Sequence, residues 1–168
     1  MLPKRLARFS LELAEEKTQL LRFGRSARRD CQRLGEGSPG TFDFLGFTHY
    51  CGRSRTGRFK LKRKTAKKKY RGKIRDLKHW FRRQRTTPLP EVWKRLNAKL
   101  RGHYQYYGVN DNWSQLMTYR HTAKQLAFRW LNRRSQKKSK TWEQFDAYQA
   151  RFPLATPKKA ASDWRHAV

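Results

Sequence analysis

The sequence contains few acidic residues, few cysteines and few β-branched aliphatic residues. Its 168 residues include 12 Asp or Glu against 42 Lys or Arg, which gives a formal net charge of +30. A surface with this charge repels itself unless an anion neutralises it, which indicates a nucleic-acid partner. Isoleucine and valine together occur only four times against 17 leucines, and this favours helices over an extensive sheet. We therefore expect a small, mostly helical core with a strongly basic surface.

Long apolar runs and cysteine pairs are also lacking. No segment approaches the roughly 18 apolar residues of a membrane span, and the basic start of the chain leads into no apolar leader segment. The two cysteines, Cys31 and Cys51, cannot form a disulfide framework, which favours a reducing compartment. We therefore expect a cytoplasmic protein with no membrane partner.

Catalytic and metal-binding patterns are missing as well. Cys31, His49 and Cys51 have no fourth ligand at zinc-finger spacing, and the sequence shows no phosphate-binding glycine loop or nucleophile elbow. The acidic residues are scattered rather than clustered. We therefore predict no catalytic residue, no metal site and no bound cofactor, so that the chain by itself binds and does not catalyse.

The charge is unevenly distributed along the chain. Residues 1–50 contain six acids, whereas residues 51–140 contain 29 Lys or Arg and only three acids, which predicts a boundary near residue 50. In the first part we expect a small antiparallel sheet or hairpin. Its expected elements are a helix over 3–13, a strand over 19–23, a loop over 25–40 and an aromatic-rich strand over 42–50.

The second part has helical periodicity. Tyr70, Ile74, Leu77 and Phe81 share one helix face, and Thr87-Pro88 begins a second helix that ends at Gly108. Asn112 with Gln115 and Thr141 with Gln144 resemble capping boxes of a third and a short fourth helix. We therefore expect a bundle of three main helices and poor order after residue 153, with a core that includes Trp93, Leu96, Leu100 and Trp130.

The run of basic residues from 53 to 69 is the strongest functional signal. Lysines and arginines at this density neutralise phosphates, whereas the alternative is a solvated basic face with a localisation role. Helical spacing leaves His103 and Tyr106 exposed beside Arg101, with Tyr104 and Tyr107 toward the core. The residues predicted to contact nucleic acid are Arg53, Arg55, Arg58, Lys60, Lys62, Arg63, Lys64, Lys67, Lys68, Lys69, Arg71, Arg101, His103 and Tyr106.

The order of several motifs resembles one family. Residues 11–24 are similar to the end of the palm of group II intron reverse transcriptases, and residues 42–47 are similar to the hairpin that follows it. Residues 59–65 continue the pattern into the thumb, and 96–108 and 131–136 resemble the maturase-specific domain, also called domain X. The resemblance covers most of the chain.

The resemblance implies an α+β fold in three parts. Residues 1–52 correspond to a small antiparallel β remnant of the palm with a primer-grip-like hairpin, 53–153 to a mainly α-helical, three-helix thumb/maturase bundle, and 154–168 to a tail. It also adds Arg133 and Arg134 to the RNA-binding set. The primer-grip-like residues are Phe44, Leu45, Gly46 and Phe47.

The resemblance further implies a maturase fragment that binds intron RNA and assists its folding and splicing. The expected partners are structured intron RNA and RNA–DNA or RNA duplex, in the bacterial cytosol with nucleoid or RNA association. The alternative is one half of a split RNA-directed DNA polymerase, active only with an upstream fingers–palm chain that supplies the Mg²⁺ site. A degenerate remnant is a third possibility.

Overall fold

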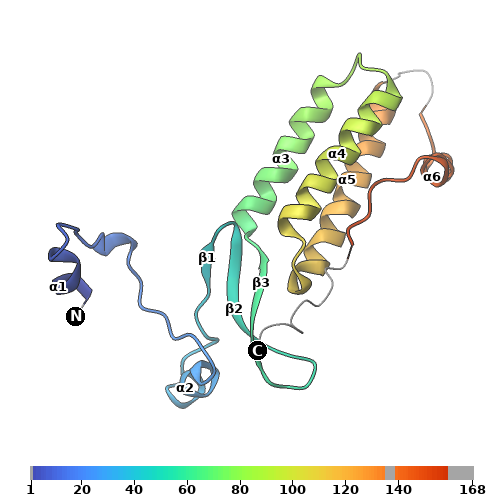
Figure 1. The fold of residues 1–168 in the computed structure, drawn as a ribbon. Coiled ribbons are helices and arrows are strands. Elements are labelled where there is room, and N and C mark those ends of the chain that lie inside the picture. Colours follow the sequence, from blue (N-terminus) through green and yellow to red (C-terminus); the bar gives the residue numbers. More distant parts are fainter. Residues whose placement is uncertain (1, 135–138, 159–168) are drawn as a thin grey trace. The chain divides into compact units, whose positions relative to one another are not determined.

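The structure of the chain is a computed structural model, and it describes residues 2–134 and 139–158. Within these residues lie six α-helices and a three-stranded antiparallel sheet (Figure 1). The helices are α1 (Leu2–Ala7), α2 (Ala27–Arg33), α3 (Lys67–Arg83), α4 (Leu89–Tyr107), α5 (Trp113–Arg134) and α6 (Trp142–Arg151), and the strands are β1 (Phe42–Phe44), β2 (Phe47–Arg53) and β3 (Phe59–Thr65). The expected α+β class is confirmed.

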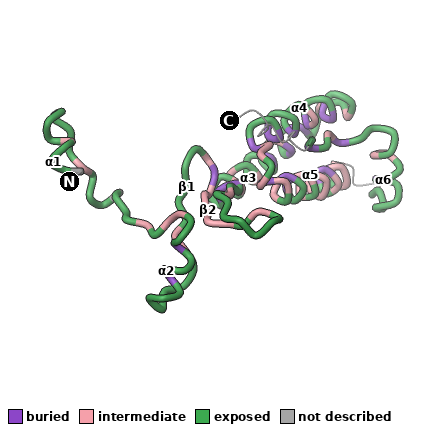
Figure 2. The backbone as a smooth tube through the Cα atoms, turned by 60° about the horizontal axis from the view of Figure 1, so that its bottom comes forward, coloured by how far each residue is buried: buried purple, intermediate pink, exposed green. Residues whose placement is uncertain are grey.

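The chain divides into two compact units. The first comprises residues 1–42 and 50–61, and the second comprises residues 43–49 and 62–168. Strands β2 and β3 each contribute residues to both units. Most described residues of the first unit are exposed, whereas buried positions are concentrated in α3, α4 and α5 of the second (Figure 2). No described helix is long and apolar enough to cross a membrane.

A tight hairpin turn joins β1 to β2, in the sheet order β1-β2-β3. The turn residues Leu45 and Gly46 have φ angles of 47° and 80°, in the left-handed region that two-residue hairpin turns favour. Glycine adopts this region without steric cost. The carbonyl oxygen of Gly46 accepts a hydrogen bond from the backbone N–H of Ala66 at 2.9 Å. The turn is therefore fixed to the residue that precedes α3.

The expectations for residues 3–40 are largely wrong. The first helix ends at Ala7, no strand forms over residues 19–23, and the expected loop over 25–40 contains α2. Helix α2 forms because Ala27 and Cys31, four residues apart, are buried on one face. No strand forms over residues 19–23, where the side chain of Leu20 is fully exposed and packs against no other described residue. Strand β3 was not expected, and the β1–β2 turn replaces the predicted connection through residues 25–40.

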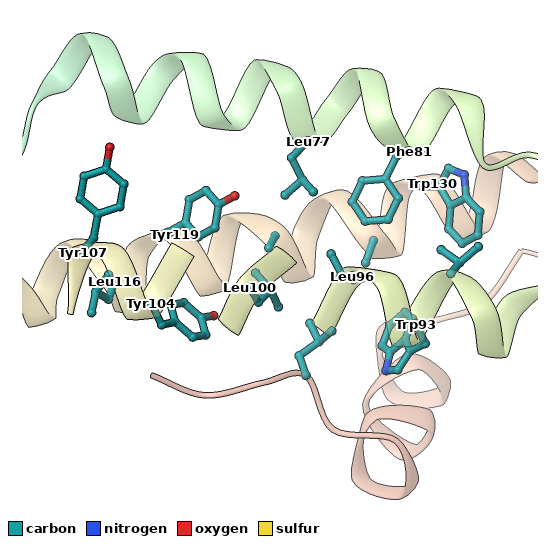
Figure 3. Packing of buried hydrophobic residues seen from close by; sticks show 14 of the residues in the cluster. Leu77, Phe81, Trp93, Leu96, Leu100, Tyr104, Tyr107, Leu116, Tyr119 and Trp130 are labelled. Carbon is teal, nitrogen blue, oxygen red and sulfur yellow. The ribbon is translucent and has the colours of Figure 1, made fainter. Parts of the chain in front are cut away.

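Helices α3, α4 and α5 form the predicted three-helix bundle. Their facing side chains make one apolar core, and Figure 3 shows leucines and aromatic rings pointing into it from all three helices. On α5, Ala123 and Ala127 are completely buried, and their small side chains allow close approach of the neighbouring helices. The residues predicted for this core are all buried: Trp93, Leu96, Leu100 and Trp130.

Residues 152–155 form a strap along α4. The indole Nε1 of Trp93 donates to the carbonyl oxygen of Phe152 at 2.8 Å, and the side-chain amide of Asn97 bonds to the backbone of both Pro153 and Ala155. Leu154, only 2% exposed, belongs to the core. The expected poor order after residue 153 is therefore wrong for residues 154–158, and residues 159–168 lie outside the described part of the chain.

The two predicted capping boxes have different outcomes. At the start of α6, Thr141 and Gln144 form the reciprocal pair of hydrogen bonds, which confirms that prediction. Asn112 instead lies in a 3-10 turn (Asn110–Asn112) and is completely buried. Its Oδ1 accepts from the N–H of Thr65 at 2.8 Å, and its Nδ2 donates to Thr65 Oγ1 and to the carbonyl of Tyr107.

Removing the amide of Asn112 should destabilise the protein strongly. In Asn112→Ala the N–H of Thr65 and the carbonyl of Tyr107 lose their side-chain partner in a buried place, which costs about 1–3 kcal/mol for each group. We expect the free energy of unfolding, measured by urea denaturation, to fall by about 3 kcal/mol or more. The exposed Asn110→Ala is the matched control and should change it by less than about 0.5 kcal/mol. Equal effects of the two substitutions would contradict this role.

Candidate nucleic-acid interface

Helix α3 carries more Lys and Arg residues than any other described helix or strand. Of its 17 residues one is acidic, Asp76, and nine are Lys or Arg: Lys67, Lys68, Lys69, Arg71, Lys73, Arg75, Lys78, Arg82 and Arg83. Its apolar residues Leu77 and Phe81 are buried in the bundle, whereas all nine cations are exposed. The narrow apolar stripe therefore anchors the helix and leaves most of its circumference positively charged.

A groove of about 740 Å³ lies between α3 and α4, and we call it the α3–α4 groove. Every residue that lines it belongs to the second unit. The lining residues are Leu45 and Gly46 of the hairpin turn, Lys69, Lys73, Asp76, Leu77 and Trp80 of α3, Lys99, Gly102, His103, Tyr106 and Tyr107 of α4, and Tyr119 of α5.

The groove combines positive charge with aromatic rings. Lys69, Lys73 and Lys99 line it with a single carboxylate, that of Asp76, so its net charge is positive. The ammonium nitrogen of Lys99 lies 5.5 Å from the centre of the Trp80 ring, a cation–π contact across the two helices. Cations that bind phosphates beside rings on which bases stack are the usual components of a single-strand nucleic-acid site.

Tyr106 connects α4 to the hairpin turn. Its hydroxyl donates to the carbonyl of Leu45 at 3.0 Å, and its ring stacks on Phe47 at 6.2 Å and 10°. Tyr106 remains 58% exposed, as predicted. Among the primer-grip-like residues, Phe44 and Leu45 are 59% and 68% exposed, whereas Phe47 is buried against the tyrosines.

His103 is buried, and the expectation that it is exposed is wrong. Its ring stacks on Tyr119 of α5 at a centroid distance of 3.7 Å, because α5 packs against this part of α4. Its Nδ1 is buried without a hydrogen-bond partner among the described residues. Burial, helped by the charge of Lys73, lowers the pKa of His103 to about 4. It therefore forms a neutral wall of the groove near pH 7.

The other predicted contact residues do not converge on this groove. Arg53 and Arg58 line a separate hollow of about 350 Å³ in the first unit with Arg25 and Arg28. Arg133 and Arg134 lie at the end of α5. The remaining members lie on β3, in the turn before it, on α3 and on α4, and all are exposed except the half-buried Lys62: Arg55, Lys60, Lys62, Arg63, Lys64, Lys67, Lys68, Arg71 and Arg101.

Sequence reasoning missed several groove residues, among them Lys73, Trp80, Lys99 and Gly102. The signal was present in the spacing, because Lys69, Lys73, Asp76 and Trp80 follow the helical pattern i, i+4, i+7, i+11 on one face. Lys99, Gly102, His103 and Tyr106 follow the same kind of pattern on α4. No group of three or more potential metal ligands occurs in the part of the chain that the structure describes.

Protonation of His103 should destabilise the fold. Because its folded pKa lies below the ordinary 6.5, the neutral histidine's contribution is fully present above pH 6.5 and is lost as the pH falls toward 4. His103→Phe retains a ring against Tyr119 without a titrating nitrogen. Between pH 7 and pH 5, the unfolding free energy of the unaltered protein should fall by roughly 2 kcal/mol more than that of the variant. Urea denaturation at the two pH values measures both changes. Equal losses in both proteins would contradict the assignment.

Comparison with known proteins identifies the bundle. The model of the family described as "Group II intron, maturase-specific domain" matches residues 67–148. The comparisons with curated proteins and with solved structures give no match. The matched segment begins at the first residue of α3, includes all of α4 and α5, and ends within α6. The match makes residues 67–148 similar to a group II intron maturase-specific domain, which is consistent with the C-terminal maturase and thumb part of a group II intron reverse transcriptase.

Proposed function

We propose that this chain binds the RNA of a group II intron through the α3–α4 groove and assists the folding of that RNA for splicing. The observation that carries the proposal is the combination of three lysines with the rings of Trp80 and Tyr106 in one groove of the family-matched bundle. Single-stranded loops and bulges of structured RNA present both phosphates and unstacked bases, which are the groups that such a groove recognises.

The proposed role in splicing follows from mass action. A protein that binds folded intron RNA and has less affinity for unfolded RNA shifts the equilibrium toward the folded RNA. The basic residues predicted from the sequence, such as Lys67 and Lys68 at the start of α3, would reduce the repulsion between phosphate groups that folding brings together. We place this activity in the bacterial cytosol, in association with RNA.

Gly102 lines the groove, and its presence there supports placing RNA in the groove. It lies in the interior of α4, where glycine costs about 0.5–1 kcal/mol relative to alanine. A methyl group added at Gly102 would meet no protein atom within 4 Å, and its φ is not in the left-handed region. Neither packing nor backbone conformation requires glycine there. Close approach of a ligand would require it.

Gly102→Ala should therefore stabilise the protein and weaken its binding to RNA. We expect a gain of about 0.5–1 kcal/mol in unfolding free energy. The dissociation constant for a structured intron RNA fragment should rise about tenfold, or 1.4 kcal/mol. Filter binding and urea denaturation measure the two effects.

Gly72→Ala is the matched control. Gly72 also lies inside a helix, with no protein atom within 4 Å of an added methyl, but it does not line the groove. It should produce the same stabilisation with an unchanged dissociation constant. If Gly102→Ala binds the RNA as tightly as the unaltered protein, the RNA does not approach α4 in this groove.

The second candidate is one half of a split reverse transcriptase. It is favoured by the exposure of Phe44 and Leu45 on the β1–β2 hairpin and by the position of β1 at the edge of the sheet. A strand edge with apolar side chains is suited to join another sheet. In this candidate function an upstream fingers–palm chain would cover the hairpin and hold Mg²⁺, and the assembly would bind an RNA–DNA or RNA duplex.

The chain alone should show no primer extension on an RNA template with Mg²⁺ or Mn²⁺ and all four nucleotides. Nucleotide transfer needs metal ions held by clustered carboxylates, and the 12 acids of this sequence are scattered. Gel analysis of a labelled primer measures extension, and an added fingers–palm fragment tests the split-enzyme candidate. Incorporation by the purified chain that Asp43→Asn abolishes would make Asp43 catalytic and overturn the binding-only proposal.

A further inference from the structure

A second hollow, of about 270 Å³, lies between the end of α3 and the end of α5, and we call it the α3–α5 hollow. Its rim carries six cations, two from α3, one from the residues that follow α3, and three from α5. They are Lys78, Arg82, Arg85, Arg129, Arg133 and Arg134. No carboxylate lines this hollow among residues 2–134 and 139–158.

Among residues 2–134 and 139–158, no carboxylate forms an ion pair with any of the six cations. Ion pairs of the described residues join Arg22 to Glu36, Arg95 to Glu91 and Lys124 to Asp146, and none of these includes a residue of the hollow. Like charges gathered around one concavity repel each other and raise the local positive potential. An anion that enters the hollow would relieve this repulsion, and several closely spaced anionic groups would relieve more of it.

The floor of the hollow is largely apolar. Phe81 and Trp130 pack at a centroid distance of 5.5 Å and are both buried in the bundle core. The guanidinium carbon of Arg134 lies 5.5 Å from the Trp130 ring centre, which fixes one cation over the floor. Arginines held in place by packing lose less conformational freedom when they bind a phosphate than freely rotating side chains do.

The hollow and the α3–α4 groove use different faces of α3. On α3, Lys73, Asp76 and Leu77 line the groove, whereas Lys78, Phe81 and Arg82, each five residues further on, line the hollow. At 3.6 residues per turn, five residues rotate a position by roughly 140° about the helix axis. Ligands in the two places therefore approach α3 from different directions.

We propose that the α3–α5 hollow binds the phosphodiester backbone of a second RNA segment, so that the domain bridges two segments of one folded RNA. This inference rests on the proposed function, since it takes the groove as the site of the first segment. Six cations over an apolar floor suit a chain of phosphates that keeps its bases outside. The site therefore contributes affinity and RNA geometry rather than sequence recognition.

A bridging assay tests this proposal on the full chain. One short RNA hairpin is immobilised, the protein is bound to it, and capture of a second, fluorescent hairpin is measured. The hollow variant carries Arg82→Gln, Arg129→Gln and Arg133→Gln, three exposed positions. We expect this variant to bind the immobilised hairpin through the groove and to capture at least tenfold less of the second hairpin. The capture of the second hairpin should also depend less steeply on salt concentration, by the equivalent of roughly 2–3 phosphate contacts.

A charge-matched control separates the hollow from the overall charge. Lys94→Gln, Lys140→Gln and Lys158→Gln remove the same three charges from exposed positions that line neither the groove nor the hollow. This control should capture the second hairpin as the unaltered protein does, and melting temperatures verify that all variants fold. Loss of capture in the control equal to that in the hollow variant would overturn the proposal, as would normal capture in the hollow variant.

The same experiment distinguishes the inference from the proposed function. Failure of the unaltered protein to bind the immobilised hairpin would overturn both. The chemical class of the ligand is tested by the indole N–H resonance of Trp130, assigned with Trp130→Phe, during titration with the hairpin or with inorganic phosphate at matched ionic strength. RNA should shift it and phosphate should not. Equal shifts would identify a site for free anions and overturn the RNA assignment.

Discussion

One buried amide holds together the elements that form the α3–α4 groove. Asn112 is completely buried, and it uses both of its Nδ2 hydrogens and its Oδ1 on Thr65 and Tyr107. Thr65 ends β3 just before α3 begins, and Tyr107 is the last residue of α4. A fully satisfied buried polar group permits few alternative arrangements. These hydrogen bonds of Asn112 fix the N-terminus of α3 relative to the last turn of α4. The shape of the groove therefore depends on them.

Helix α3 separates packing from charge along its circumference. Helix α3 is anchored by a narrow set of buried or half-buried residues, Tyr70, Ile74, Leu77 and Phe81, and its cations occupy the remaining surface. The repulsion between these cations is a cost of the folded state that the apolar core offsets. Trp130 belongs to both regions, since it lies in the core and also lines the α3–α5 hollow.

The parts of the structure that local patterns determine could be predicted from the sequence. The three main helices follow from apolar periodicity, and the Thr141–Gln144 box follows from adjacent residues. Strand β3 was missed because Phe59 and Leu61 alternate with Lys60 and Lys62, which resembles a solvated basic run. The burial of His103 and the grouping of Lys73 with Lys99 depend on how α4 is rotated against its neighbours, and no single helix encodes that rotation.

The strap over α4 has a consequence for synthesis on the ribosome. Trp93, Asn97 and Tyr104 receive their hydrogen-bond partners from Phe152, Pro153 and Ala155, between 51 and 59 residues later in the chain. At about 5–20 residues per second, translation separates the two segments by roughly 3–12 s. During this interval the nascent chain exposes a basic surface beside an unfinished core. Under the proposed function, RNA near the ribosome meets that surface before the final segment closes over α4.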